Sequence, residues 1–102
     1  MAIDLFCYAS LTLSDCDRKL SELHEKRRDL FEHSFVLYAP RSADNMQREI
    51  AKDYAFERCV STFLVSLNEK QHAGRVPEVA EVLKKQLGAE NVLILQNNDF
   101  VR

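Results

Sequence analysis

Glycine and proline are scarce in this sequence, with two of each in 102 residues. The only glycines are Gly74 and Gly88, so the chain contains neither the G-x-G-x-x-G fingerprint of dinucleotide-binding folds nor a phosphate-binding P-loop. Nucleotide binding through these two devices is therefore excluded. The scarcity of both residues also leaves little material for long irregular connections.

The chain also lacks an excess of positive charge and a long apolar run. Fourteen basic residues stand against 16 acidic ones, which gives a net charge of −2 and a pI of about 5.9. Nucleic-acid-binding domains usually carry a clustered basic surface. No stretch approaches the ~18 apolar residues of a membrane-spanning helix, and Asp4 interrupts the first apolar run, so a secretory signal pattern is absent. We expect no direct nucleic-acid or membrane partner.

The three cysteines, Cys7, Cys16 and Cys59, are odd in number and widely spaced. This pattern does not suit a disulfide framework and favours a reducing, cytoplasmic location. There is no C-x-x-C motif, and "HEKRR" at 24–28 lacks the second histidine of a zinc-binding helix. We predict neither a metal nor a cofactor.

What the sequence does have is a regular alternation of apolar runs and amphipathic stretches. Hydrophobic residues make up 46% of the chain, and the length suits one domain with a single modest core over 1–102. Helical spacing predicts helices at 15–32, from Ser42 onward and at 77–87, and the apolar runs predict strands at 2–9, 35–39, 60–67 and 91–96. Ser14 and Ser42 are candidate caps of the first two helices, and Gly88 suits the residue just past the end of the third.

The predicted order is therefore β-α-β-α-β-α-β. It is typical of an α/β domain with a four-stranded, mostly parallel or mixed sheet and three helices. Both faces of the strand at 2–9 are mostly apolar, which favours cover on both sides. Three helices cannot cover both faces of four strands completely, so part of a face or an edge is expected to stay open. The predicted buried stripe of the second helix consists of Met46, Ile50, Ala51 and Tyr54.

Parallel strands would collect their carboxyl ends at one rim of the sheet, which is where ligands of open α/β sheets usually bind. The alternative is that strand ends are polar because loops are solvated. The rim residues expected from the sequence are Ser10, Arg41, Asn68, Glu69, Lys70, Asn97, Asn98 and Asp99.

Cys7 is the main candidate nucleophile in the sequence, because it lies near the end of the first predicted strand. A cysteine phosphatase would need an arginine six residues later, where this chain has Leu13. A phosphocarrier or small transferase using Cys7 remains an alternative, although a buried apolar role suits the residue better. Glu69-Lys70 lacks the intervening residue of the D/E-x-K motif of metal-dependent nucleases. We therefore predict no enzymatic activity.

One charge pattern points to a partner. Four acidic residues and two basic ones lie between positions 42 and 57. An acidic ridge of this kind can attract a basic surface, and the alternative is an ordinary solvated helix face. The acidic residues are Asp44, Glu49, Asp53 and Glu57.

Several stretches, in this order along the chain, resemble immunity proteins of bacterial contact-dependent growth inhibition (CDI) systems. They are "MAIDLFCYAS", "DLFEHSF", "PRSAD", "EIA", "FLVSLNEK" and "VLILQNNDF". The resemblance implies a cytoplasmic protein that forms a heterodimer with the C-terminal toxin domain of a CDI effector. The nearest resemblance is to immunity proteins of nuclease toxins that cleave transfer RNA, whose active or nucleic-acid-binding site would be blocked without covalent chemistry.

The resemblance does not assign contact residues, and a regulatory homodimer with an open sheet edge remains a further alternative. Carboxylates on an inhibitor can stand in for the phosphates that a nuclease grips. Combining the acidic ridge with the rim, we expect the toxin to contact Arg41, Asp44, Glu49, Asp53, Asn68, Glu69, Lys70, Asn97, Asn98 and Asp99.

Overall fold

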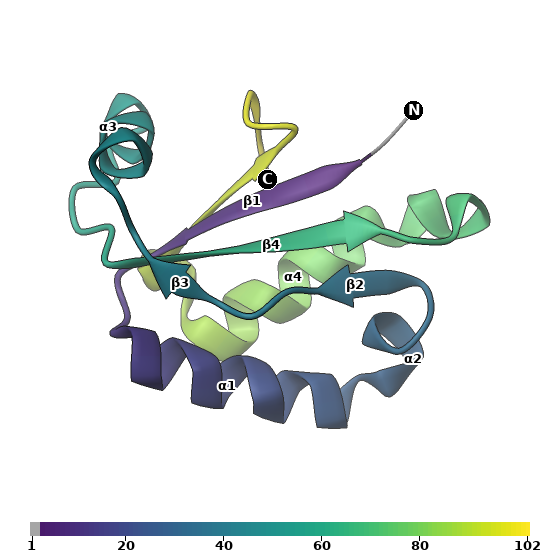
Figure 1. Cartoon of the computed structure of the whole chain (residues 1–102). Coiled ribbons are helices and arrows are strands. Elements are labelled where there is room, and N and C mark those ends of the chain that lie inside the picture. The colour runs from purple at the N-terminus through teal and green to yellow at the C-terminus, as the bar shows by residue number, and fades with distance from the viewer. Residues whose placement is uncertain (1–2) are drawn as a thin grey trace.

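The computed structural model describes residues 3–102, which form one six-stranded antiparallel sheet with helices on both faces (Figure 1). The strand order is β2-β4-β1-β5-β6, and β3 pairs with β4 on the same side as β2. The edge next to β4 is thus one interrupted strand, β2 followed by β3. The strands are β1 (Asp4–Ala9), β2 (Phe35–Leu37), β3 (Arg41–Ser42), β4 (Ser61–Leu67), β5 (Val92–Gln96) and β6 (Phe100–Val101).

The helices divide unequally between the two faces of the sheet. Figure 1 shows α1, α2 and α4 together beneath the sheet, and α3 alone above one end of it. None of the helices in residues 3–102 is long and apolar enough to cross a membrane. The helices are α1 (Leu13–Lys26), α2 (Arg28–Phe31), α3 (Asn45–Asp53) and α4 (Val76–Leu87), with short 3-10 turns η1 (Lys70–Arg75) and η2 (Ala89–Asn91).

The predicted four-stranded, mostly parallel sheet is wrong. Every strand pairing that the structure describes is antiparallel. The predicted β-α-β-α-β-α-β order with three helices is also wrong, because α2 follows α1 and β3 and β6 follow β2 and β5 with no α-helix between them. Parallel directions occur only between strands that are not neighbours: β1 and β2 have β4 between them, and β4 and β5 have β1 between them. The connections through α1 and α2 and through α4 therefore each skip one strand, as in split β-α-β motifs, whereas α3 joins β3 to its direct neighbour β4. Sequence periodicity indicates where strands and helices lie along the chain, but it does not reveal which strand lies between two strands joined by a helix.

The first predicted helix, at 15–32, is two helices separated by Arg27. The helix α1 begins earlier than expected because the Thr12 hydroxyl, rather than Ser14, caps it by accepting a hydrogen bond from the Asp15 N–H at 3.2 Å. At Arg27 the backbone leaves the helical region, with φ −125° and ψ 53°. Two strands, β3 and β6, were missed because each has only two residues.

The helix α3 also begins differently from the prediction. Ser42 lies in β3, and Asp44 is the cap: its carboxylate accepts from the Gln47 N–H, and the Gln47 side chain accepts from the Asp44 N–H. Ala51 is fully buried as predicted, but Met46 is 74% exposed, so its place in the buried stripe was wrong. Ala51 is the one residue of α3 that is buried, so Met46, more than a turn earlier, is left exposed.

The larger core lies between the sheet and α1, α2 and α4. Leu5, Cys7 and Ala9 of β1 point into it, and Leu83 of α4 is completely buried there. Alternate residues of β1 face α3, where Tyr8 joins a smaller cluster with Ala51. The expectation that β1 is covered on both sides is thus confirmed at this end. Gly88 ends α4 as predicted, with φ 97°, a conformation that favours glycine.

Candidate functional site

The face of the sheet that carries α3 is only partly covered. Pairing registers place Leu64, Phe6, Leu95 and Val101 side by side across β4, β1, β5 and β6. Tyr38 extends this row at the edge, where its N–H donates to the Leu64 carbonyl at 3.0 Å. The result is a continuous apolar row that crosses the sheet beside α3.

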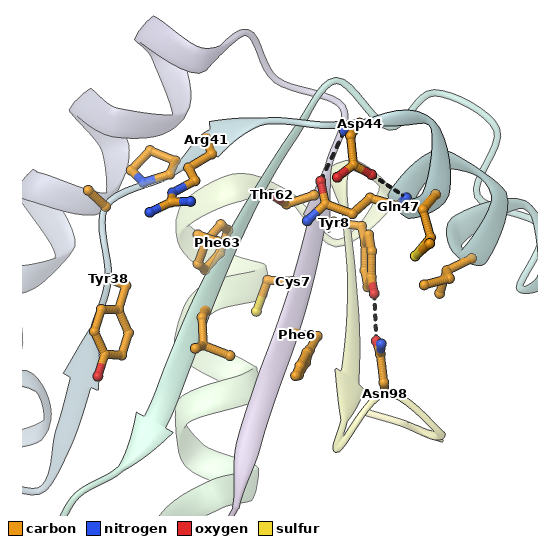
Figure 2. Close-up of a pocket in the computed structure, with 15 residues that line it drawn as sticks. Phe6, Cys7, Tyr8, Tyr38, Arg41, Asp44, Gln47, Thr62, Phe63 and Asn98 are labelled. Atoms are coloured by element: carbon orange, nitrogen blue, oxygen red, sulfur yellow. Dashed lines mark hydrogen bonds between the residues drawn. The ribbon is translucent and has the colours of Figure 1, made fainter.

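A groove of about 670 Å³ lies over this row, between α3, the β2–β3 edge and the turn after β5. Figure 2 shows Phe6 on its floor, Tyr38 on the edge side and Asn98 on the opposite side. Leu64 completes the floor, and Ile50 of α3 forms part of the wall. Because the floor belongs to strands at the centre of the sheet, its shape is preorganised.

Two large apolar side chains at the groove remain exposed. Met46 at the start of α3 is 74% exposed, and Tyr38 on the edge is 49% exposed. Val36, on the same face as Tyr38 and opposite Ser66 of β4, is 36% exposed. Contiguous apolar surface of this kind marks binding sites more often than isolated exposed residues do.

Polar groups surround the groove. The buried Tyr8 hydroxyl donates to Asn98 Oδ1 at 2.5 Å (Figure 2), which holds the turn after β5 over the sheet. Burial raises the pKa of Tyr8 above its ordinary value, although the bond to Asn98 acts in the opposite direction. A phenol is neutral at physiological pH even without this shift, so Tyr8 can donate. Arg41 and Asp44 are the charged lining residues, with Gln47 between Asp44 and the groove floor.

The antiparallel sheet separates the residues predicted to share one rim. Ser10 follows β1 and Arg41 lies in β3, at the end where β4 begins. The segments 68–70 and 97–99 follow β4 and β5 at the opposite end. The single rim was therefore wrong, since it depended on parallel strands. Of the six residues in the segments 68–70 and 97–99, only Asn98 lines the groove, where it is bonded to Tyr8.

The segment Asn68-Glu69-Lys70 is held by contacts within the chain. The Asn68 side chain donates to the His33 carbonyl at 2.8 Å, and the Asn68 and Glu69 N–H groups both donate to the Ser34 carbonyl. The Glu69 carboxylate lies 3.3 Å from His72 Nδ1. Asn68 thus fastens the end of β4 to the turn before β2, whatever else it contacts.

The acidic residues of α3 are less isolated than the charge pattern indicated. One oxygen of Asp44 caps the helix, and Glu49 lies 3.6 Å from the Lys52 ammonium. Asp53 ends the helix at its far end from Asp44. The exposed side of α3 therefore presents mixed charge beside an apolar groove, rather than an unbroken acidic ridge.

Cys7 is not placed as a nucleophile. The thiol is buried on the helix side of β1, and burial raises its pKa well above the usual range. Its sulfur lies 3.6 Å from the Leu5 carbonyl. A thiol held protonated in an apolar core is unreactive, so the carrier or transferase alternative loses its main residue. Within residues 3–102 no cluster of three or more His, Cys, Asp or Glu is arranged to hold a metal ion.

Sequence reasoning missed the apolar side chains of the groove, which we call the groove set: Phe6, Tyr38, Met46, Ile50 and Leu64. Each was assigned to a strand or to a buried helical stripe. The available signal was the expectation that three helices could not cover both faces. Periodicity alone does not tell an apolar residue under a helix from one beside it.

Comparison with known proteins places this fold in a family. The model of the family described as "CDI System Immunity Component" matches residues 1–100, and the chain belongs to this family of immunity proteins. The resemblance noted in the sequence is thereby confirmed.

Individual relatives agree over the whole length. The chain is 37% identical over 102 residues, covering both proteins completely, to "Immunity protein CdiI-2" of Burkholderia pseudomallei (strain 1026b). It also superposes with a TM-score of 0.93, at 35% identity, on a chain of the structure "CdiA-CT/CdiI toxin and immunity complex from Burkholderia pseudomallei", covering 97% of this chain and 95% of that one. The chain is an immunity protein of a CDI toxin–immunity system.

Proposed function

We propose that this protein acts in the cytoplasm by binding a cognate CDI nuclease toxin and covering its active or nucleic-acid-binding site. The observation that carries the proposal is the full-length similarity, at a TM-score of 0.93, to a chain solved in a toxin and immunity complex. The nuclease type follows the resemblance described above. Inhibition by occlusion needs neither a catalytic group nor a cofactor on the immunity protein.

The proposed contact surface is centred on the open face of the sheet. A stable complex of ordinary size buries roughly 800 Å² on each partner, and the whole chain exposes 5940 Å². The groove alone is too small for such an interface, but the groove together with α3 and the neighbouring turn supplies a continuous surface. Its polar members are Arg41, Asp44, Glu49, Asp53, Asn97, Asn98 and Asp99.

We assign Asn68, Glu69 and Lys70 to the periphery of this interface. They lie at the end of β4 that is distant from β3 and, unlike Asn98 at the same end of the sheet, none of them lines the groove. Asn68 and Glu69 already have partners within the chain. A peripheral residue contributes little affinity, because water still reaches it in the complex.

Co-expression with the cognate toxin domain tests the proposed function. Bacteria that express the toxin domain alone should stop growing, and co-expression of this protein should restore growth. The purified proteins should elute together as a one-to-one heterodimer, and adding the immunity protein should stop RNA cleavage by the isolated toxin. Continued growth arrest despite soluble immunity protein, with no complex formed, would show the proposal to be wrong.

A further inference from the structure

We propose that the groove beside α3 receives an apolar side chain from a loop of the toxin, and that this anchor provides a large share of the binding energy. The inference rests on the proposed function, since it names how the same partner is held. Nothing in the similarity to other immunity proteins assigns this groove a role.

The first support is that large apolar side chains are buried on one face of the sheet and exposed on the other. On the helix side, large apolar residues such as Leu83, Phe35 and Ile94 are essentially inaccessible. Beside α3, Tyr38 and Met46 remain largely exposed although they line a groove whose floor is apolar. Covering them with a partner would remove apolar area from water, which contributes about 25 cal/mol for each Å² buried.

The second support is the chemistry of the lining. The floor and inner wall, made by Phe6, Leu64 and Ile50, suit an apolar or aromatic tip. At the mouth, Arg41 and Asp44 are one cation and one anion, so the opening has no strong preference for either charge. A phosphorylated ligand would need more positive charge than Arg41 alone supplies. An apolar side chain with polar backbone on either side matches this arrangement.

The third support is the position of the groove within a larger surface. It adjoins α3, on which Asp44, Glu49 and Asp53 are exposed. Asp44 also caps the helix and Glu49 also pairs with Lys52, so the carboxylates beside the groove would meet basic groups of a nuclease as part of a mixed-charge surface. Affinity in such interfaces concentrates in a few anchors that fill central pockets and are ringed by polar contacts. The groove set has the apolar centre, and α3 and Arg41 supply a polar ring.

Rigidity favours this groove over a flexible loop as the anchoring site. Phe6 and Leu64 face each other across the β1–β4 pairing, and the Tyr8–Asn98 hydrogen bond holds the opposite wall. Because the walls are already ordered, little conformational entropy is lost when a side chain enters.

Alanine substitution of the two exposed groove residues tests the inference. The Tyr38→Ala/Met46→Ala variant should bind the purified cognate toxin about 30-fold or more weakly than the wild type, the size expected for central anchors. The matched control is Leu13→Ala, which removes an apolar side chain, 40% exposed, from the first turn of α1. Calorimetry gives both affinities, and thermal unfolding checks that each variant is folded.

Equal affinities of the double variant and the Leu13→Ala control would overturn the groove proposal. In that case, tight binding by both variants would leave the proposed function intact. Failure of the wild-type protein to bind any cognate toxin would remove both proposals, so the two failures are distinguishable.

A second measurement follows binding by the wild-type protein and needs a substitution only to assign its signals. Met46 and Met1 are the only methionines, so selective ¹³C labelling of methionine methyl groups gives two NMR signals, which Met46→Ala assigns. Addition of toxin should shift the Met46 signal strongly. An unshifted Met46 signal at saturating toxin would overturn the proposal.

The competing occupant is a second copy of this chain. Light scattering of the wild type alone should report a monomer. A dimer that dissociates in the Tyr38→Ala/Met46→Ala variant would assign the groove to self-association and overturn the toxin-anchor proposal.

Discussion

Both faces of the central sheet carry apolar strand residues, but these residues lie in different environments. On one face, α1, α2 and α4 bury a continuous core in which Leu5, Phe35 and Leu83 are nearly inaccessible. On the other face, the nine residues of α3 cover one end only, and Tyr38 and Met46 remain exposed. The first face thus accounts for most of the stability of the fold, and the second leaves apolar surface for recognition.

Separating the packed face from the exposed face has a physical advantage for a protein that binds a partner. A domain of about 100 residues has a free energy of unfolding of roughly 5–15 kcal/mol. Leaving apolar residues exposed for binding therefore must not reduce the stability of the folded state by much. Keeping the exposed apolar groove on strands whose other side is fully packed fixes its shape. The binding face can then vary without loss of the core.

The largest expected effect comes from the helix-covered face. Leu83→Ala should lower the free energy of unfolding by about 2–5 kcal/mol, because the side chain is completely buried in α4 and leaves a cavity. Urea denaturation measures this. Met46→Ala, as the counterpart on the open face, should change stability by less than about 0.5 kcal/mol. Similar losses in the two variants would abolish the distinction between the faces.

A smaller effect is expected at the cap of α3, the helix that only half covers the open face. Asp44→Ala removes the capping box and should cost about 1 kcal/mol of unfolding free energy. Asp44→Asn retains a capping oxygen and should be nearly as stable as the wild type, although it lacks the charge. Thermal unfolding and toxin affinity of the pair separate the two roles: a large affinity loss in Asp44→Asn would identify the charge as a contact.

The smallest effect concerns an ion-pair network outside the helix-covered core. Arg27 and Arg75 both lie within 3.0 Å of Asp29 oxygens, and both also pair with Glu78. Hydrogen bonds from these guanidinium groups hold the pKa of Asp29 well below its usual range and also lower that of Glu78. Because the carboxylates are about half exposed, Asp29→Asn should cost less than about 1 kcal/mol.

The sign of the pH dependence follows from the lowered pKa values. The stabilisation is fully present above the unfolded pKa values, near 4, and is lost as pH falls through the lower folded values. Urea denaturation between pH 6 and 3 should show a shallower decline for Asp29→Asn than for the wild type, and high salt should reduce the difference. Identical pH profiles would contradict a stabilising role for the network.

Much of the secondary structure could be predicted, and the reasons are local. Strands β1, β4 and β5 were placed to within a few residues, since each is a run of apolar residues. The end of α4 at Gly88 followed from the backbone freedom of glycine. The start of α3 was missed because Ser42 and Asp44 are both good caps, and pairing of Ser42 with Ser61 in the sheet decides between them.

The candidate site was predicted less well. The interface residues outside the acidic ridge were predicted to share one rim, but the antiparallel sheet puts Arg41 and Asn68 at opposite ends of β4. Phe6, Tyr38 and Leu64 of the groove set were assigned to strands. Ile50 and Met46 were assigned to a buried helical stripe, because of the helical spacing of Met46. Its exposure depends on how far α3 extends over the sheet, which no local pattern records.

The sequence by itself determined where the longer strands β1, β4 and β5 and the helix α4 lie, the absence of glycine-based phosphate sites and the membership of an immunity protein family. Those properties depend on residue identity, short-range periodicity and similarity along the chain. Tertiary structure alone decided the strand order, the unequal cover of the two faces and the groove at Tyr38 and Met46. The strand order depends on which strand lies between two strands joined by a helix, and the cover of each face depends on where the helices pack. Both are set by contacts between residues far apart in the chain.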